Sequence, residues 1–355
     1  MVGTYSKYSY LFVLTGPVLG YFSLTYTGIW PWVLPIYVFV LIPLAEYFSP
    51  QSTANLKKEE EDKALKDPVY DLMLYFMLPI QYILLFYYLN TIGQPGLSYM
   101  DIAGRVFTMG ISCVVLGINV GHELGHRKTW HEQWMSKLLL LSTLYMHFII
   151  EHNKGHHKRV ATKEDPASAR YGESLYVFWV RSVFGSFKSA WNIEVKRLNK
   201  LSKAWWHPAN EMFHFIIIQF GFILFVYLLF DFSHAMYFIA AAGIGFLFLE
   251  TVNYLEHYGL SRKKLPNGNY EKVMPIHSWN SNHYVGRVFL FELTRHSDHH
   301  YKASRKYQIL RHMDDAPQLP FGYPVMILMA LFPPLWFYVL HRHMKKLGFD
   351  RAVYN

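Results

Sequence analysis

Cysteine is nearly absent from this sequence, since Cys113 is the single one among 355 residues. One thiol cannot close a disulfide within the chain, and it cannot build a cysteine-ligated iron–sulfur, rubredoxin-like or zinc-ribbon site. We therefore expect Cys113 to be a packing residue. If the chemistry of this chain consumes electrons, another protein must deliver them.

Charged residues are missing from long stretches, including residues 8–45 and 72–100. At about 1.5 Å per helical residue, residues 8–45 can form two membrane-spanning helices joined near residues 28–31. This first block runs past the length of a signal-peptide core and lacks a small-residue cleavage pattern, so we expect it to be retained. The apolar blocks predict about six spans, at residues 9–28, 31–48, 71–92, 102–121, 213–231 and 235–254.

The composition agrees with a membrane protein, because 52% of the residues are hydrophobic and 18% are aromatic. We predict one all-α integral membrane domain over residues 1–355, a helical bundle with a histidine-rich helical cap at residues 122–210 and 257–355. Lysine and arginine gather in this cap and in the 46–67 loop, which places both on the cytoplasmic side. The net charge of +9 then reports topology and attraction to lipid headgroups, and we expect no nucleic-acid binding.

Two further apolar stretches are not expected to cross the membrane. Residues 138–150 are too few to span, and a crossing there would separate two histidine clusters. Residues 316–340 contain five prolines, and a crossing there would put the basic HRHMKK tail outside. Arg105, near the outer end of the fourth span, is expected to extend its side chain to the interface.

The spacing of the histidines is the main functional signal. The motifs HELGH, EHNKGHH and RHSDHH place histidines three or four residues apart, so that they share a helix face, and NYLEHYGL adds one at the end of the sixth span. Neutral imidazole binds iron, zinc, copper or nickel, and nine donors exceed the four of a structural zinc site. The pattern predicts two metal ions, each held by four or five histidines. The nine histidines are His122, His126, His152, His156, His157, His257, His296, His299 and His300.

The other ten histidines lack this spacing, and we interpret them as surface or hydrogen-bonded residues. Among them, His277 and His283 in HSWNSNH are candidates for spare ligands or for groups that orient a ligand. The remaining eight are His131, His147, His207, His214, His234, His312, His341 and His343.

Five polar residues are candidates for hydrogen bonds that orient the ligand histidines. Glu250 and Asn253 share a helix face with His257, at spacings of i, i+3 and i+7. Glu123, Asp165 and Asp298 lie within or beside the histidine motifs. For these three, a plain salt bridge or helix cap is an equal alternative.

Two other classes of function fit parts of the pattern. HELGH also matches zinc proteases, with Glu123 as the general base, but a protease leaves most of the clustered histidines unexplained. A histidine-lined metal transporter would place polar or charged residues inside the spans, and residues 8–45 and 72–100 carry no charge.

The histidine motifs, separated by hydrophobic blocks, resemble the membrane fatty-acid desaturase and hydroxylase superfamily. Wider segments are similar to signature stretches of bacterial alkane 1-monooxygenases, namely EHNKGHHKRVATKEDPASAR, NYLEHYGL, HSWNSNH and LTRHSDHHYKASRKYQILR. NYLEHYG is the most discriminating, and the similarity covers about residues 10–335. One departure is VATKEDPA, where Lys163 and Glu164 replace a shorter, proline-containing turn; it affects no ligand.

The resemblance implies an oxidoreductase that uses O2 to hydroxylate the terminal methyl group of an alkane, giving a primary alcohol. It implies that the nine histidines bind two iron ions, and that rubredoxin donates electrons after reduction by a flavin-containing rubredoxin reductase. Some relatives carry a fused rubredoxin, which these 355 residues with one cysteine do not contain. The alkane would arrive from the bilayer, and the expected location is the bacterial inner membrane, with the site toward the cytoplasm. A related desaturase or hydroxylase acting on another lipid-like chain remains an alternative, because ligand motifs do not separate these reactions.

Two further expectations concern the partners. Lys154, Arg159, Lys163, Lys196 and Arg197 cluster in the cap and could dock an acidic electron donor, although topology or headgroup charge explains them equally. Four aliphatic residues on one face of the second span are candidates for the wall of an alkane channel, with helix packing or lipid contact as the alternative. These four residues are Leu34, Val38, Leu41 and Ala45.

Overall fold

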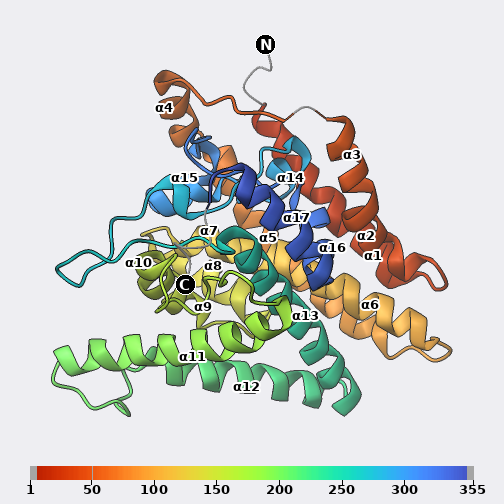
Figure 1. The fold of residues 1–355 in the computed structure, drawn as a ribbon. Helices are drawn as coiled ribbons and strands as arrows, with labels where there is room; N and C mark the ends of the chain where they lie inside the picture. Colours follow the sequence, from red (N-terminus) through yellow and green to blue (C-terminus); the bar gives the residue numbers. More distant parts are fainter. Residues whose placement is uncertain (1–5, 50, 350–355) are drawn as a thin grey trace.

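Residues 6–49 and 51–349 are described by the computed structural model, which Figure 1 shows as a bundle of helices. Within these residues no β-strand forms, and extended segments make only isolated bridges, such as that between Gln51 and His283. The all-α fold class is confirmed. The two ends of the predicted domain, residues 1–5 and 350–355, lie outside the described residues.

Five helices are long and apolar enough to cross a membrane, and they match five of the predicted spans. They are Trp30–Phe48, Pro68–Ile92 (α5), Tyr99–Gly125, Glu211–Leu229 (α12) and Phe232–His257 (α13). The first predicted span, residues 9–28, forms a 3-10 helix, η1 (Lys7–Leu14), followed by α1 (Thr15–Thr25), and is not among the five. The chain is an integral membrane protein.

Two of the five helices contain a π-helical segment. Trp30–Phe48 consists of η2 (Trp30–Trp32), α2 (Val33–Ile36), the π-helix η3 (Tyr37–Leu41) and α3 (Ile42–Phe48). Tyr99–Gly125 consists of α6 (Tyr99–Ser112), the π-helix η4 (Cys113–Asn119) and α7 (Val120–Gly125). A π turn holds one residue more than an α turn, so it rotates the face that the following residues present.

Four of the five long helices begin at a side-chain cap. Asp67 accepts a hydrogen bond from the backbone of Val69 ahead of α5, and Ser98 caps α6. Asn210 and Asp231 do the same for α12 and α13. These caps satisfy backbone donors that would otherwise be unpaired, and they fix where each helix starts.

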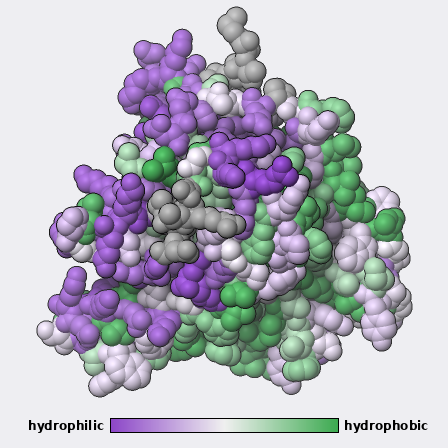
Figure 2. All heavy atoms as spheres, in the orientation of Figure 1, coloured by the Kyte–Doolittle hydropathy of each residue, from purple (hydrophilic) through white to green (hydrophobic). Residues whose placement is uncertain are grey.

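The rest of the chain forms the predicted cap beside the spans. Figure 2 shows hydrophilic residues gathered over α4 and around α10 and α15, and hydrophobic residues over α2 and α3. The two apolar stretches that were not expected to cross lie in α8, α9, α16 and α17, none of which is among the five candidate spans. In the predicted 46–67 loop, α4 (Lys58–Lys66) forms. The helical segments of the cap are α8 (Trp130–Leu141), α9 (Phe148–Glu151), η5 (His152–His156), α10 (His157–Arg159), α11 (Leu175–Lys200), η6 (Pro275–His277), α14 (Tyr284–Phe289), α15 (His296–Tyr301), η7 (Tyr307–Ile309), α16 (Tyr323–Ala330) and α17 (Pro333–Lys346).

Arg105 is buried among the helices, whereas the sequence led us to expect an extended side chain. Its side chain is fully buried, and its Nη1 donates to the backbone carbonyl of Thr91, 2.5 Å away, in the last turn of α5. A second nitrogen, Nη2, lies 3.4 Å from the carbonyl of Tyr26. The last carbonyls of a helix lack partners within the helix, so an inward-facing guanidinium is stabilised there.

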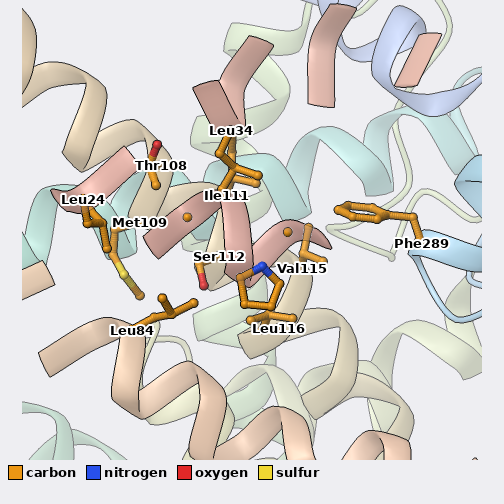
Figure 3. Close-up of a pocket in the computed structure, with 13 residues that line it drawn as sticks. Leu24, Leu34, Leu84, Thr108, Met109, Ile111, Ser112, Val115, Leu116 and Phe289 are labelled. Atoms are coloured by element: carbon orange, nitrogen blue, oxygen red, sulfur yellow. The ribbon is translucent and has the colours of Figure 1, made fainter. Parts of the chain in front are cut away.

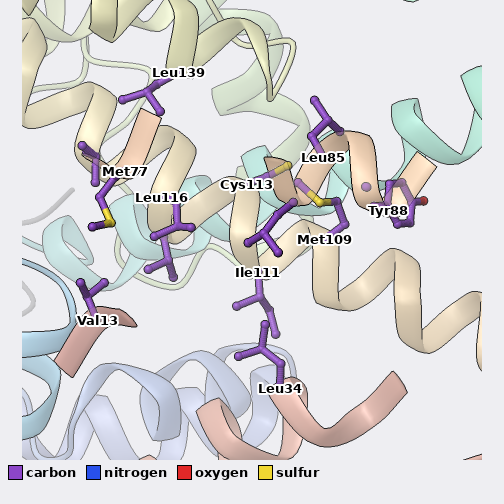
Figure 4. Close-up of a cluster of buried hydrophobic side chains, with 14 of the residues drawn as sticks. Val13, Leu34, Met77, Leu85, Tyr88, Met109, Ile111, Cys113, Leu116 and Leu139 are labelled. Carbon is purple, nitrogen blue, oxygen red and sulfur yellow. The ribbon is translucent and has the colours of Figure 1, made fainter. Parts of the chain in front are cut away.

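Close packing of small residues holds α13 against α6 and η4. A Cβ atom added to Gly245 would lie 2.6 Å from the Cβ of Cys113, and one added to Gly110 would lie 2.4 Å from Cγ2 of Ile244. Figure 4 shows Cys113 inside the main core cluster, near Leu85 and Met109. This contact fixes the helix that ends at His257 relative to the helix that carries His122.

We expect Gly245→Leu to destabilise the protein by about 1–3 kcal/mol, because the added side chain would overlap the Cβ of Cys113, which cannot move without its backbone. The measurement is the midpoint of thermal unfolding in detergent. Gly243→Leu is the control on the same helix, since a Cβ there meets nothing within 4 Å. Equal midpoints for the two variants would contradict the packing argument.

Candidate metal centre

All nine histidines singled out by their spacing lie together in the structure, and they divide into two groups. Within each group, one ring nitrogen of every histidine lies within 4.8 Å of the corresponding nitrogen of every other. The first group has five members, His122, His126, His152, His157 and His299. The second has four members, His156, His257, His296 and His300.

The five-histidine group is a chain of facing Nε2 atoms. His122 Nε2 lies 3.2 Å from that of His126 and 3.0 Å from that of His299. The Nε2 of His157 lies 3.1 Å from that of His299 and 3.0 Å from that of His152. Three separate segments, α7, η5–α10 and α15, therefore converge on one point.

The four-histidine group has the same geometry and is deeper. The Nε2 of His300 lies 3.2 Å from the Nε2 of His156 and 2.9 Å from the Nε2 of His296. The Nε2 of His296 lies in turn 3.2 Å from the Nε2 of His257. All four side chains are buried. The groups are neighbours, because the rings of His157 and His300 have their centroids 4.5 Å apart.

The π-helix η5 decides how the EHNKGHH histidines divide. The sequence pattern placed His152 and His156 on one α-helical face, but they belong to different groups. In a π turn the backbone hydrogen bond joins residues five apart rather than four, and His152 is paired with His157, five residues on. In α15, by contrast, His296 and His300 keep the α-helical spacing and share a group.

Most of the histidines are held in the neutral state that a metal ion requires. Burial, together with the charge of neighbouring histidines, holds the pKa of His126, His152, His296, His299 and His300 well below its usual range. Their rings are therefore neutral at physiological pH, and neutral imidazole is the form that binds metals.

The spacing of the nitrogens also fits a metal ion in each group. The observed Nε2 separations of 2.9–3.2 Å are those of adjacent ligands that each lie about 2.1 Å from one ion. Several Nε2 atoms face two others at once, and one ring hydrogen cannot satisfy both contacts. A cation at the centre of each group satisfies every lone pair.

Asp165 is the one predicted carboxylate that contacts a histidine of the centre. Its Oδ2 lies 2.8 Å from Nδ1 of His156, and both side chains are buried. Burial alone would lower the pKa of His156, but the Asp165 carboxylate raises it. Because Nδ1 donates to this carboxylate, the lone pair of Nε2 points toward the other histidines.

The other four predicted orienting residues make different contacts. Glu250 accepts from the hydroxyl of Tyr145 at 2.7 Å and from Asn253 at 3.3 Å, so these two residues bond to each other rather than to His257. Asp298 pairs with Arg305 at 2.6 Å. For Asp298 this is the salt bridge that the sequence left open as an equal alternative.

Glu123 likewise pairs with an arginine instead of a histidine. Its Oε1 lies 2.6 Å from Nη2 of Arg127 and also accepts from the backbone of Tyr307. A protease would need this carboxylate free to activate water beside the metal. The contacts of Glu123 therefore argue against the protease reading of HELGH.

Sequence reasoning missed Glu256. Its Oε2 lies 3.1 Å from Nε2 of His296, and its Oε1 accepts a hydrogen bond of 2.8 Å from the hydroxyl of Tyr323. Its position directly before His257, at the end of a span, was a usable signal, because a buried carboxylate next to a metal-binding motif needs a partner. The helix-face pattern pointed instead to Glu250 and Asn253, one and two turns before His257 in α13.

Neither His277 nor His283 joins the two groups. His277 Nδ1 accepts from the backbone of Met274, and its Nε2 lies 3.3 Å from Glu271. His283 Nδ1 lies 2.9 Å from the hydroxyl of Ser281. The next residue after His277, Ser278, does approach the centre, with its hydroxyl 3.5 Å from Nδ1 of His257.

Three neighbouring apolar cavities lie beside the histidines and among the membrane-spanning helices. The first, about 30 Å³, is lined by His122, His152, His296 and Glu256 among apolar residues. It shares Val114, Asn119, Val252 and Leu293 with a second cavity of about 70 Å³. The second shares Ile111, Val115 and Phe289 with a third, which Figure 3 shows between the first spans.

Two of the four predicted channel residues line these cavities. Val38 lines the second cavity and Leu34 the third. Leu41 is 50% exposed and Ala45 is also exposed, so the predicted stripe is wrong for these two. The π-helix η3 adds a residue to the turn, and Ile42 takes the inward position that α-helical spacing had assigned to Leu41.

Comparisons with known proteins point to one family. The fatty acid desaturase family model matches residues 101–330. An alkane 1-monooxygenase of Acinetobacter baylyi is 40% identical over 308 residues, which are 87% of this chain and 75% of that protein. Alkane 1-monooxygenase 1 of Alcanivorax borkumensis is 40% identical over 325 residues, 90% of this chain and 80% of that protein. The hydroxylase component of xylene/toluene monooxygenase from Pseudomonas putida is 29% identical, over 75% of this chain and 72% of that protein.

Proposed function

The chain belongs to the alkane 1-monooxygenase family, within the fatty acid desaturase family, and from this membership we propose that it hydroxylates the terminal methyl group of alkanes. The observation that carries the proposal is the meeting of two histidine groups with one apolar cavity path. We propose that the groups hold two iron ions. When bound, these ions supply the activation of O2 that a methyl C–H bond requires and that no side chain can provide.

The residues of this chain hold and orient the centre. Nine Nε2 atoms converge on two positions, and Asp165 fixes the ring of His156. Orientation by a buried carboxylate keeps the correct nitrogen facing the metal. The small Asn119 side chain, at the junction of the first two cavities, donates to the carbonyl of Leu290 at 3.0 Å and so exposes little polarity to the path.

The cavities suit an alkane. They are lined almost wholly by aliphatic and aromatic carbon until they reach His122, His152 and His296. An apolar path excludes water and binds a hydrocarbon by burial of its surface. Because the path runs among the membrane-spanning helices, the substrate can come from the bilayer, where alkanes concentrate.

The proposal includes the orientation of the basic cap in the membrane and the identity of the electron donor. The basic cap faces the cytoplasm of a bacterial inner membrane, following the distribution of lysine and arginine. The resemblance to the family supports rubredoxin, kept reduced by rubredoxin reductase, as the electron donor, and the one cysteine among these 355 residues cannot build a redox site of that kind here.

The test is to quantify iron in the purified protein and to analyse the products of a plain alkane by gas chromatography, with a rubredoxin system as donor. A primary alcohol together with bound iron supports the proposal. Activity on acyl thioesters alone would favour the desaturase alternative. Activity on methylbenzenes alone would favour a function like that named for the xylene/toluene relative.

We expect Val38→Trp to shift the substrate range toward short alkanes. Val38 lines the second cavity, and an indole there would fill space that only a long chain needs. Leu41→Trp is the matched control on the same helix, because Leu41 faces outward. The measurement is the relative rate over a series of linear alkanes; a uniform loss across the series, or the same shift in both variants, would refute the channel assignment.

A further inference from the structure

The cap helix α11 has three faces of different chemistry. One face packs against the rest of the protein, and its residues recur every three or four positions, as on the buried side of an α-helix. The other two faces are exposed, one of them apolar and the other basic. The buried residues are Leu175, Phe178, Ser182, Ser186, Ala190, Glu194 and Leu198.

The apolar face of α11 carries large exposed side chains. They lie at spacings of i, i+1, i+4, i+8 and i+11, so they share one side of the helix, and none of them is charged. Phe184 is 73% exposed, and Val180, one turn before it, is 62% exposed. Such a face is typical of a helix that lies along a membrane surface. We name these residues the apolar stripe; they are Tyr176, Val177, Val180, Phe184 and Phe187.

The apolar stripe continues onto a membrane-spanning helix. The ring centroids of Phe187 and Trp191 lie 6.5 Å apart, and those of Trp191 and Phe213, in the first turn of α12, lie 5.2 Å apart. Further along α12, Ile217 and Phe220 are exposed. Because α12 is one of the candidate spans, these side chains face lipid. The two apolar surfaces are continuous, so the same acyl chains can cover both.

The basic face of α11 forms one wall of a cleft. The cleft has a volume of about 340 Å³, and residues 159–170 form its opposite wall. Gly185 allows the two walls to approach each other, since a Cβ atom there would lie 2.8 Å from the Cβ of Pro166. Lys188 in the cleft directly follows Phe187 of the apolar stripe. The basic and apolar surfaces therefore share an edge.

The cleft has more exposed positive than negative charge. Arg159 and Arg181 are each bound to a glutamate. Asp165 is buried and bound to His156, which leaves Glu164 as the exposed carboxylate of the cleft. Four further cations are exposed, and none of them forms an ion pair within residues 6–49 and 51–349. These cations are Lys163, Arg170, Lys188 and Lys196.

This distribution divides the five basic residues that the sequence offered either for donor docking or as headgroup charge. Arg159 and Arg197 are bound to buried glutamates. Lys163 and Lys196 line the cleft, and Lys154 is exposed outside its lining. The five residues therefore do not form one surface, and only two of them contribute free charge to the cleft.

We propose that the cleft binds the phosphate group of an anionic phospholipid whose acyl chains lie along the apolar stripe. Lysine and arginine near a membrane surface attract anionic headgroups, and a zwitterionic headgroup carries its own cation and gains less from them. A soluble anion would use the charge of the cleft but not the stripe. An anionic phospholipid matches both surfaces and the edge that they share. The inference does not depend on the reaction at the metal centre.

The experiment titrates the delipidated, iron-loaded full chain in detergent with phosphatidylglycerol or phosphatidylcholine and counts bound lipid by native mass spectrometry. Lys188→Gln/Lys196→Gln removes two charges from the cleft. Lys345→Gln/Lys346→Gln is the matched control, because these two lysines are exposed at the end of α17 and do not line the cleft. Lys188→Arg/Lys196→Arg keeps the charge in the cleft. The midpoint of thermal unfolding and the iron content show that each variant is folded.

We expect the unaltered chain to bind one phosphatidylglycerol about 10–30-fold more tightly than phosphatidylcholine, and the glutamine variant of the cleft to lose this preference. The control variant and the arginine variant should keep the preference to within about twofold. Inorganic phosphate and glycerophosphoglycerol, the headgroup without acyl chains, should not displace the lipid at equal concentration.

Three results would overturn the proposal. One is an equal affinity of the unaltered chain for the two lipids, and another is an equal loss in the cleft and control variants. The third is displacement of phosphatidylglycerol by a competitor without acyl chains. Displacement by inorganic phosphate or by the free headgroup identifies a site for soluble anions, and displacement by rubredoxin identifies a protein docking site.

Discussion

Replacing His156 or His299 by alanine is expected to abolish alkane hydroxylation and to remove about half of the bound iron. Each residue belongs to a different group, so each variant should lose mainly one of the two ions. His299 Nε2 lies 3.0 Å from that of His122 and 3.1 Å from that of His157, and a methyl group cannot replace a donor at this position.

The measurements are iron per chain by elemental analysis and alcohol by gas chromatography. His131→Ala is the control, because His131 lies outside both groups, with its Nε2 3.4 Å from the hydroxyl of Tyr75. Normal iron with full activity in either the His156 or the His299 variant would remove that residue from the set of ligands. Loss of all iron in both variants would show instead that neither position is filled without the other.

Asp165→Ala should weaken metal binding by about 10–100-fold, the usual effect of removing a carboxylate that orients a ligand histidine. The substitution leaves Nδ1 of the buried His156 without its partner at 2.8 Å. The ring can then rotate, and its Nε2 is no longer aimed at the metal position. Asp165→Asn should be milder, because the amide oxygen can still accept from Nδ1.

The readout is the rate at which a chelator removes iron from the purified protein, which does not depend on turnover. Glu164→Ala is the neighbouring control, because Glu164 is exposed and makes no contact with the histidines. The orienting role of Asp165 is lost if the alanine and asparagine variants release iron at the rate of the Glu164 variant.

Glu123, Glu250 and Asp298 have structural roles, because none of the hydrogen bonds that they make in the described part of the chain goes to a histidine of the centre. Each was a candidate for orienting a histidine, and each instead joins segments that are distant in sequence: Glu123 to Tyr307, Glu250 to Tyr145 and Asp298 to the backbone of Arg311. Their substitution should therefore act through the stability of the cap. Only Asp165 combines burial with a direct histidine contact among the five predicted residues.

The sequence alone determined five of the six predicted spans and the set of nine histidines. The length of a hydrophobic stretch is a local property of the sequence, and five such stretches predicted helices that the structure contains. These stretches are residues 31–48, 71–92, 102–121, 213–231 and 235–254. Histidines at short, repeated spacings next to span ends predicted one shared location, and all nine lie there. Caps such as Asp67 and Asn210 are also local signals.

Tertiary structure decided the division of those histidines and the faces of the helices. The π turns in η3 and η5 depend on how a helix packs against its neighbours, and spacing rules for an ideal α-helix therefore misplaced His156, Leu41 and Ala45. Glu256 and Arg105 acquire their roles from Tyr323, His296 and Thr91, which lie on other segments. Such contacts join residues far apart in the chain, and no local pattern in the sequence encodes which buried polar groups will meet.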